Sequence, residues 1–313
     1  MSGKPRIVCV GEGMAELFRA PGGGADDWQM AHGGDMLDVG VHLARLGCDV
    51  AFLSSLGADR FSLAARAAWE GEGLDCSLVS EHPARNIGLY AIHTDAAGER
   101  SFTYWRETAA ARHMFAPELF APIRAAAERA DLLVFSLISL AILDEAGRGE
   151  LLALAQHVRG KGGRVMFDGN YRPRLWASRE EALDWRNAGA ASATMGLPTL
   201  EDEASLAGLG DAQAVYESWM EASEGKAEVV VKLGADGCRL PDGTIVPPPA
   251  RLDPVDTSGA GDAFDAGYLS ARLAGDEPAQ AALAGHALGG WIVMRRGAIP
   301  PVDDAAPYAG LRR

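Results

Sequence analysis

The segment Asp256-Thr257-Ser258-Gly259-Ala260-Gly261-Asp262-Ala263-Phe264 joins a turn-forming run directly to apolar residues with helical spacing. Gly259 and Gly261 let the backbone bend and present its N–H groups, because neither residue has a Cβ. The first turn of a helix has unpaired amide donors and a partial positive charge, so this turn can bind an anion. Asp262 places a carboxylate at this anion-binding turn. This pattern favours a role for Asp262 as a base that takes a proton from the group that attacks a phosphate. The alternative is a capped loop in which Asp262 only complements the helix dipole.

Length and composition describe a globular protein. The chain of 313 residues is long enough for one large α/β domain with an appendage, or for two modest domains. Its 43 acidic and 29 basic side chains give a net charge of -14, which argues against nucleic acid or an anionic membrane as a partner. The 4 cysteines are scattered, without zinc-ligand spacing or a disulfide framework. Since neither a membrane span nor a signal-peptide core is apparent, we expect a cytoplasmic protein.

The N-terminal region begins with an apolar run, Arg6–Val10, that is typical of a buried strand. Gly11-Glu12-Gly13 follows and invites a dinucleotide-binding interpretation, but Glu16 stands where the third glycine is needed. We therefore expect short strands and turns up to Ala31. The segment His32-Gly33-Gly34-Asp35-Met36-Leu37-Asp38 then leads into a helix. Its glycines let a ligand approach the backbone, although a tight turn alone would also explain them.

Between Ile87 and Trp105, two extended runs are joined by Asp95-Ala96-Ala97-Gly98, which predicts a hairpin. A hairpin within an alternation of strands and helices suggests a lid. The second run, Ser101-Phe102-Thr103-Tyr104-Trp105-Arg106, is an aromatic strand that ends in one cation. The alternative is a strand that packs its aromatic side chains into the core and leaves Arg106 solvated.

A second strand is predicted at Val50–Leu53, before a helix at Phe61–Gly71, and this succession of strand, helix and strand implies parallel pairing. Further buried strands are predicted at Asp131–Ser136 and Arg164–Phe167. Asp168-Gly169-Asn170-Tyr171-Arg172 follows the last of these strands, at the carboxyl end where open α/β sheets bind ligands. Asn170 and Arg172 could instead only hold a loop.

The segment Asp256–Asp262 resembles the C-terminal signature of the ribokinase-like (PfkB) carbohydrate kinases, and the resemblance extends from the first strand to Arg296–Pro300. It implies an α/β fold, a ribokinase-like three-layer sandwich with a central, mostly parallel sheet and helices on both faces. It also implies one kinase domain over residues 1–313, with a small β lid at about 12–32 and 86–107. Its cofactors would be ATP and Mg²⁺. The protein would form a homo-oligomer, either a dimer or a larger assembly. The need for a monovalent cation near residues 253–256 is left open.

The resemblance also implies roles for individual residues. Catalysis would involve Asp262 as the base for the sugar hydroxyl, Gly259, Ala260 and Gly261 around the transferred phosphoryl group, and Arg172 as a compensating cation. Nucleotide binding would involve Asn170, Arg172, Lys232, Gly234, Ala235, Gly237, Gly259, Gly261 and Ala287. Glu203 would organise Mg²⁺ through water, although Leu200 replaces the family's Asn. The acidic run Glu201-Asp202-Glu203 could instead be a charged first turn of a helix, favoured by the helix dipole.

Tyr104-Trp105-Arg106 with Ala109-Ala110-Ala111 resembles one branch of the family, the 2-keto-3-deoxygluconate kinases. This implies phosphorylation of that sugar acid at its terminal (6-) hydroxyl, with Arg106 as the partner of its carboxylate. The substrate-binding residues would be Gly33, Gly34, Asp35, Asp38, Tyr90, Tyr104, Arg106, Arg172 and Asp262. Asp38 replaces an Asn of the family. The Asn side chain donates and accepts hydrogen bonds, whereas an ionised Asp only accepts them. A kinase for another sugar or sugar acid and a non-catalytic sugar-binding regulator are the alternatives.

Overall fold

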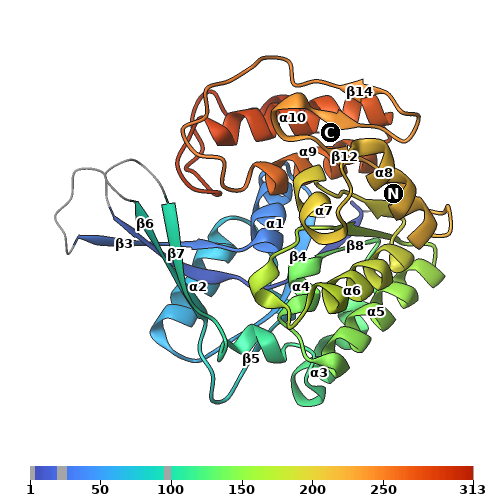
Figure 1. Cartoon of the computed structure of the whole chain (residues 1–313). Helices are drawn as coiled ribbons and strands as arrows, with labels where there is room; N and C mark the ends of the chain where they lie inside the picture. Colours follow the sequence, from blue (N-terminus) through green and yellow to red (C-terminus); the bar gives the residue numbers. More distant parts are fainter. Residues whose placement is uncertain (1–3, 20–26, 95–99, 313) are drawn as a thin grey trace.

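The computed structural model describes residues 4–19, 27–94 and 100–312. The predicted hairpin turn at 95–98 and part of the predicted lid, 20–26, lie outside the described residues. A sheet of 7 strands forms the centre, in the order β11-β10-β9-β8-β1-β4-β5 (Figure 1). All its pairs are parallel, which confirms the predicted sheet. The strands are β1 Arg6–Val10, β4 Asp49–Leu56, β5 Val79–Glu81, β8 Leu132–Ser136, β9 Arg164–Asp168, β10 Met195–Gly196 and β11 Glu228–Val229.

Helices cover both faces of this sheet. Successive side chains of a strand point to opposite sides, so the apolar strands have side chains to bury on each face. Ile7 and Cys9 of β1 belong to one buried cluster, and Val8 and Val10 to another. The first cluster includes residues of α1 Asp35–Arg45, α2 Arg60–Gly71, α9 Ala260–Leu273, α10 Pro278–Val293 and the short α11 Tyr308–Leu311. The second includes residues of α3 Pro117–Ala127, α4 Leu137–Ala141, α5 Glu145–Gly160, α6 Arg179–Ser192, α7 Leu200–Ala207 and α8 Ala212–Ala222. The predicted three-layer sandwich is therefore confirmed, and no helix in the described ranges is long and apolar enough to cross a bilayer.

A second sheet of 4 strands, in the order β3-β2-β6-β7, stands beside the main sheet, at the left of Figure 1. Its strands are β2 Met14–Arg19, β3 Trp28–Gly33, β6 Gly88–Thr94 and β7 Arg100–Trp105. The two chain segments pair directly, because β2 lies parallel to β6. The described parts of the two predicted lid segments thus form one sheet, which we call the lid sheet.

The mostly apolar run Val229–Lys232 divides between two sheets. Its first part is β11 of the main sheet, while β12 Val231–Lys232 begins a small antiparallel sheet with β13 Cys238–Arg239 and β14 Ile245–Val246. Gly237 makes the return from β12 to β13 at φ 101°, and a Cβ there would lie 2.1 Å from the carbonyl oxygen of Val246. A larger residue would therefore block this turn. Short 3₁₀ helices lie at Cys76–Leu78, Ala110–His113, Pro173–Leu175 and Gly234–Asp236.

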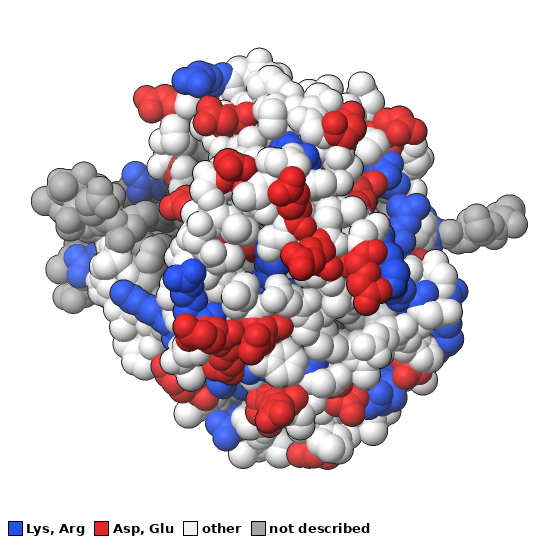
Figure 2. Space-filling model, turned by 45° about the vertical axis from the view of Figure 1, so that its right-hand side comes forward, with Lys and Arg blue, Asp and Glu red and all other residues white. Residues whose placement is uncertain are grey.

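Parallel strands bring their carboxyl ends to one edge of the main sheet, where the following loops can meet. Ser136 ends β8 and lies directly opposite Asp168, the last residue of β9. The loops after these strands therefore begin side by side. Figure 2 shows acidic side chains interspersed with basic ones over one face of the molecule, so the net charge of -14 is not gathered there into one continuous acidic surface.

Candidate functional site

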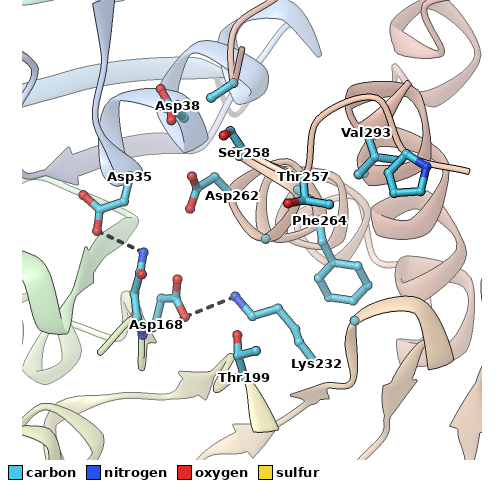
Figure 3. Close-up of a pocket in the computed structure, with 18 of the residues that line it drawn as sticks. Asp35, Asp38, Asp168, Thr199, Lys232, Thr257, Ser258, Asp262, Phe264 and Val293 are labelled. Atoms are coloured by element: carbon cyan, nitrogen blue, oxygen red, sulfur yellow. Dashed lines mark hydrogen bonds and ion pairs between the residues drawn. The ribbon is translucent and has the colours of Figure 1, made fainter. Parts of the chain in front are cut away.

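A cavity of about 920 Å³ lies between the lid sheet, the carboxyl edge of the main sheet, and helices α1, α9 and α10. It brings together residues that are far apart in the sequence, as Figure 3 shows for Asp35, Asp168, Lys232 and Asp262. The predicted site residues on its wall are Gly34, Asp35, Asp38, Tyr90, Tyr104, Arg106, Asn170, Arg172, Lys232, Gly234, Ala235, Gly237, Gly259, Ala260, Gly261 and Asp262.

Three predicted positions, Gly33, Ala287 and Glu203, are not on the cavity wall. A Cβ at Gly33 would lie 2.5 Å from the hydroxyl oxygen of Tyr90, so this glycine makes room for Tyr90. Ala287 lies on α10, whose cavity face is formed by Gly285, His286, Gly289 and Gly290. The face that α10 turns toward the cavity depends on its packing against α9.

Glu203, which was predicted to organise Mg²⁺ through water, lies behind the cavity wall. The side chain is 1% exposed and absent from the cavity wall. Its oxygens accept hydrogen bonds from Arg186 Nε (3.1 Å) and Nη2 (2.7 Å) and from Trp219 Nε1 (2.9 Å). Asp202 and Glu201 line the cavity instead, because neighbouring residues of a helix point about 100° apart. The carboxylates of this acidic run that face the cavity are therefore those of Glu201 and Asp202, one and two positions before Glu203.

Helix α9 begins at the cavity with Gly259 as its N-cap, in the left-handed conformation at φ 70°. A Cβ on Gly259 would lie 2.5 Å from the Cβ of Ala298, so close packing also requires glycine here. Asp262 lies in the first turn and points into the cavity (Figure 3). Desolvation, followed by the negative charges of Asp35 and Asp168, raises the pKa of Asp262 to about 8. A carboxylate with this pKa is suited to take up a proton near neutral pH.

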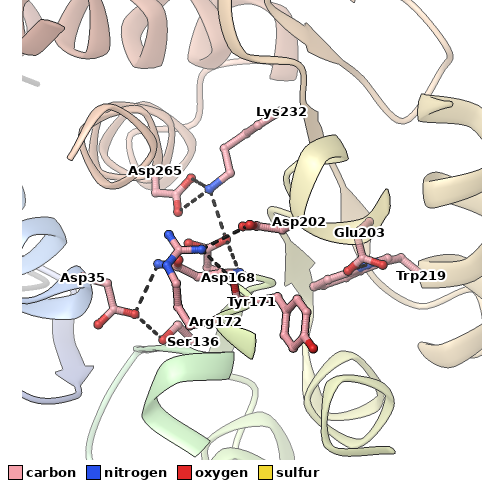
Figure 4. Close-up of polar contacts among 11 residues, drawn as sticks. Asp35, Ser136, Asp168, Tyr171, Arg172, Asp202, Glu203, Trp219, Lys232 and Asp265 are labelled. Atoms are coloured by element: carbon pink, nitrogen blue, oxygen red, sulfur yellow. Dashed lines mark hydrogen bonds and ion pairs between the residues drawn. The ribbon is translucent and has the colours of Figure 1, made fainter. Parts of the chain in front are cut away.

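Lys232 is buried between two carboxylates (Figure 4). Its Nζ lies 3.1 Å from Asp168 Oδ1, and 3.0 and 3.1 Å from the two carboxylate oxygens of Asp265. Burial disfavours the charged lysine, but these carboxylates outweigh it and raise the pKa of Lys232. The ammonium therefore stays charged beside the start of α9, 3.7 Å from where a Cβ of Gly261 would lie. Asp168 and Asp265 were not predicted as site residues, although Asp265 stands one helical turn after Asp262.

Arg172 and Asn170 line the cavity on the loop after β9. Arg172 Nη1 donates to Asp202 Oδ1 at 3.1 Å, while half of its side chain is exposed. Asn170 Nδ2 donates to Asp35 Oδ2 at 3.4 Å, and Asn170 Oδ1 has no hydrogen-bond partner among the described residues. Both side chains thus have groups available for a ligand.

The lid sheet contributes an aromatic wall with one buried ion pair. The rings of Tyr90 and Tyr104 stack with centroids 5.7 Å apart, and the hydroxyl of Tyr90 donates to Glu16. Arg106 is only 8% exposed and donates from Nη2 to Glu12 Oε2 at 2.5 Å, whereas Trp105 is 55% exposed. The alternative of a core aromatic strand with a solvated arginine is therefore wrong.

Glu12 and Glu16 were not predicted as site residues. Burial raises the pKa of Glu12, although Arg106 opposes the shift. Within the described part of the chain, Glu12 Oε1 and Arg106 Nε have no hydrogen-bond partner. The pair therefore keeps one acceptor and one donor unused. Glu16 lies opposite Tyr90 in the parallel pairing of β2 with β6, which explains their contact.

The opposite end of the cavity is mostly apolar. Its wall includes Pro248, Ala250, Leu252 and Val293 together with the glycines of α10. His286 Nε2 lies 2.9 Å from the carbonyl oxygen of Val246, and this hydrogen bond fixes the orientation of the imidazole ring. An apolar slot that leads to the amides of α9 fits a nucleotide, with the base in the slot and the phosphates at the helix N-terminus. No group of three metal-binding side chains occurs among the described residues.

Comparison with known proteins identifies relatives over nearly the whole chain. Residues 4–305 match the model of the pfkB family carbohydrate kinases. The Escherichia coli K12 protein 2-dehydro-3-deoxygluconokinase is 40% identical over 306 residues, covering 95% of this chain and 97% of that protein. The structure of a Xylella fastidiosa fructokinase with bound ATP is similar with a TM-score of 0.81, at 25% identity and with 98% of each chain covered. A Thermotoga maritima 2-dehydro-3-deoxygluconokinase has the same fold, with a TM-score of 0.80 at 20% identity, over 95% of this chain and 96% of that one.

Proposed function

The chain belongs to the pfkB family of carbohydrate kinases, and we propose that it transfers a phosphoryl group from ATP to the terminal (6-) hydroxyl of 2-keto-3-deoxygluconate. This substrate is the 2-dehydro-3-deoxygluconate in the name of the Escherichia coli relative. The products would be 2-keto-3-deoxy-6-phosphogluconate and ADP. The observation that carries the proposal is that one cavity holds Asp262 at the start of α9 and Arg106 on the facing lid sheet.

Asp262 is the proposed base. Its carboxylate stands at the helix start where a phosphoryl group would be received, so a substrate hydroxyl between them could lose its proton to Asp262 as it attacks. Asp35 and Asp168 help to keep its pKa near the pH at which it must work. The protein's contribution is then mainly the position of the two reactants.

Three groups would balance the charge of the transferred phosphoryl group. The first amides of α9 have no partner within the helix and point toward its N-terminus. Lys232 holds a fixed positive charge beside that turn, and Arg172 reaches the same cavity from the loop after β9. Mg²⁺, when bound with ATP, would neutralise phosphate charge. Since the described residues offer no ready-made metal cluster, phosphate oxygens would supply much of its coordination, with Asp202 and Glu201 nearby.

Arg106 is the proposed partner of the substrate carboxylate. Its guanidinium is already held by Glu12, but the unused Nε and the remaining donors can still reach an anion. Glu12 thereby fixes the guanidinium in the cavity wall. A neutral hexose would make less use of this arginine, which is why the site favours a sugar acid.

A kinase assay with several acceptors tests the proposal. ATP consumption would be measured with 2-keto-3-deoxygluconate, gluconate, fructose and ribose, with the Asp262→Asn protein as the matched control. We expect the highest kcat/KM with the keto acid and a kcat at least about 100-fold lower in the control. Higher kcat/KM with fructose or ribose would favour a neutral-sugar kinase. Absence of ATP consumption with every acceptor would favour a sugar-binding regulator.

We also propose that the lid sheet closes over the sugar, because the transferred phosphoryl group must be kept from water. Backbone hydrogen exchange in β2, β3, β6 and β7 should then slow when the sugar acid binds. Exchange that is equal with and without the ligand would mean that the lid sheet is a fixed wall.

A further inference from the structure

The carboxyl group of Asp38 is an unexplained polar group in the cavity wall. Asp38 lies in α1 and is 4% exposed. The backbone N–H of Gly34 donates a hydrogen bond to its carboxyl group. Its Oδ1 has no hydrogen-bond partner in the part of the chain that the structure describes. The cavity wall therefore contains one buried oxygen of Asp38 that no described protein atom satisfies.

The groups facing Asp38 are acidic and come from several elements. They are Asp35 of its own helix, Glu16 of β2, Tyr90 of β6 and Asp262 of α9. Figure 3 shows Asp35, Asp38 and Asp262 around the same part of the cavity. An ionised Asp38 would add another negative charge to this group, with its Oδ1 removed from water.

The cations of the cavity are each held by a different carboxylate. Arg106 pairs with Glu12, and Arg172 with Asp202. Arg251, which is largely exposed, pairs with Asp236. Lys232 lies between Asp168 and Asp265. Asp38 has no ion pair of its own among the described residues, so a bound proton is the simplest way to neutralise it.

We propose that Asp38 carries a proton in the ligand-free protein and donates it in a hydrogen bond to an uncharged oxygen of the sugar acid. The identity of the ligand rests on the proposed function, whereas the protonation does not. A neutral carboxyl group both donates and accepts, so it can hold a hydroxyl or carbonyl oxygen without repelling an anionic substrate. Burial, followed by the charges of Asp262 and Glu16, raises the pKa of Asp38, in agreement with this assignment. Asp38 would thus be a specificity residue that needs no cation.

Infrared difference spectroscopy tests the proton without any ligand. Protein with ¹³C-labelled aspartate carboxyl groups would be compared at pH 7 with its Asp38→Asn variant, which is similar in size. We expect the difference spectrum to show loss of a protonated carboxyl band. Loss of an ionised carboxylate band instead would overturn the proposal.

Calorimetric binding of 2-keto-3-deoxygluconate in the absence of ATP tests the donated hydrogen bond. At about pH 6.5, Asp38→Asn should bind within about fivefold of wild type, because the amide also donates, whereas Asp38→Ala should bind more than about fivefold more weakly. A loss beyond fivefold in Asp38→Asn, or a smaller loss in Asp38→Ala, would contradict the donor role. A wild-type affinity that improves relative to Asp38→Asn as the pH rises would also contradict it.

These two measurements separate failure of this inference from failure of the proposed function. If the wild-type protein does not bind the sugar acid, the assigned substrate is wrong, yet the infrared result still decides whether Asp38 is protonated. The binding comparison would then use the acceptor that the kinase assay identifies.

Discussion

The two ends of the cavity use different means to hold a ligand. At the lid end, Glu12, Glu16, Asp38 and Arg106 place charged or ionisable groups on the wall. At the α10 end, the wall is made by backbone, glycines and apolar side chains such as Leu252 and Val293. Under the proposed function, one end would select by charge and hydrogen bonding, and the other by shape.

The junction between these ends explains why both are needed. Lys232 and Asp262 lie there beside the first turn of α9, where a phosphoryl group would pass from one ligand to the other. Charged side chains are concentrated at the proposed point of transfer and at the lid end. The slot proposed for the adenine base has mostly apolar walls. Substitutions at the junction should therefore affect turnover and stability, and those at either end should affect the binding of one ligand only.

The largest effect is expected at the junction, from Asp262→Asn. Asn has nearly the same shape but cannot accept the hydroxyl proton, so kcat should fall by roughly 100-fold to 10,000-fold. The affinities for ATP and the sugar acid, measured by calorimetry, should change little. A variant that keeps more than about a tenth of the wild-type kcat would remove Asp262 from the base role.

Lys232→Met tests the junction through stability. It leaves Asp168 and Asp265 buried without their cation, so the free energy of unfolding should fall by about 3 to 5 kcal/mol. Lys226→Met is the matched control, because Lys226 pairs with Glu224 on the surface and should contribute about 1 kcal/mol or less. Urea unfolding measures both. Equal losses of unfolding free energy in the two variants would show that the buried pairing of Lys232 with Asp168 and Asp265 stabilises the protein no more than a surface ion pair does.

Arg106→Gln tests charge recognition at the lid end. Glutamine keeps some donors but removes the charge, so KM for 2-keto-3-deoxygluconate should rise by about 10-fold to 100-fold. KM for a reduced analogue without the carboxylate should change far less, and steady-state kinetics with both substrates measures the difference. If both KM values rise equally, Arg106 is a structural residue of the lid sheet.

Gly290→Val tests recognition by shape at the α10 end and should have the smallest effect. A Cβ at Gly290 would lie 3.3 Å from Leu252 Cδ1, so a branched side chain should narrow the slot. We expect KM for ATP to rise by about 3-fold to 10-fold, with KM for the sugar acid unchanged. Gly149→Val is the control, since a Cβ there meets no atom within 4 Å. An equal rise for both substrates would contradict the separation of the two ends.

Much of the fold was predictable because its signals are local. Continuous apolar runs such as Arg6–Val10 predict buried parallel strands, and the glycines before Asp262 predict a ligand-binding helix start. Contacts between distant segments carry no such signal. The pairing of Arg106 with Glu12 spans 94 residues, and it depends on how the lid sheet meets the end of β1.

The burial of Glu203 shows a second reason. Glu201, Asp202 and Glu203 form one acidic run, and each fits a charged first helical turn equally well in the sequence. Only the packing of α7 on Arg186 and Trp219 decides which carboxylate is buried and which lines the cavity. The side chains at the site could thus be predicted by type, but not always by position.

The pH dependence of kcat/KM for 2-keto-3-deoxygluconate tests the base assignment most directly. As the proposed base, Asp262 would work in its ionised form. Its pKa is raised to about 8, so the protonated, inactive fraction should grow as the pH falls. We predict that kcat/KM decreases about tenfold per pH unit below an inflection at about pH 8. A value that stays constant between about pH 6 and pH 9 would contradict a catalytic base whose pKa is set by these neighbouring carboxylates.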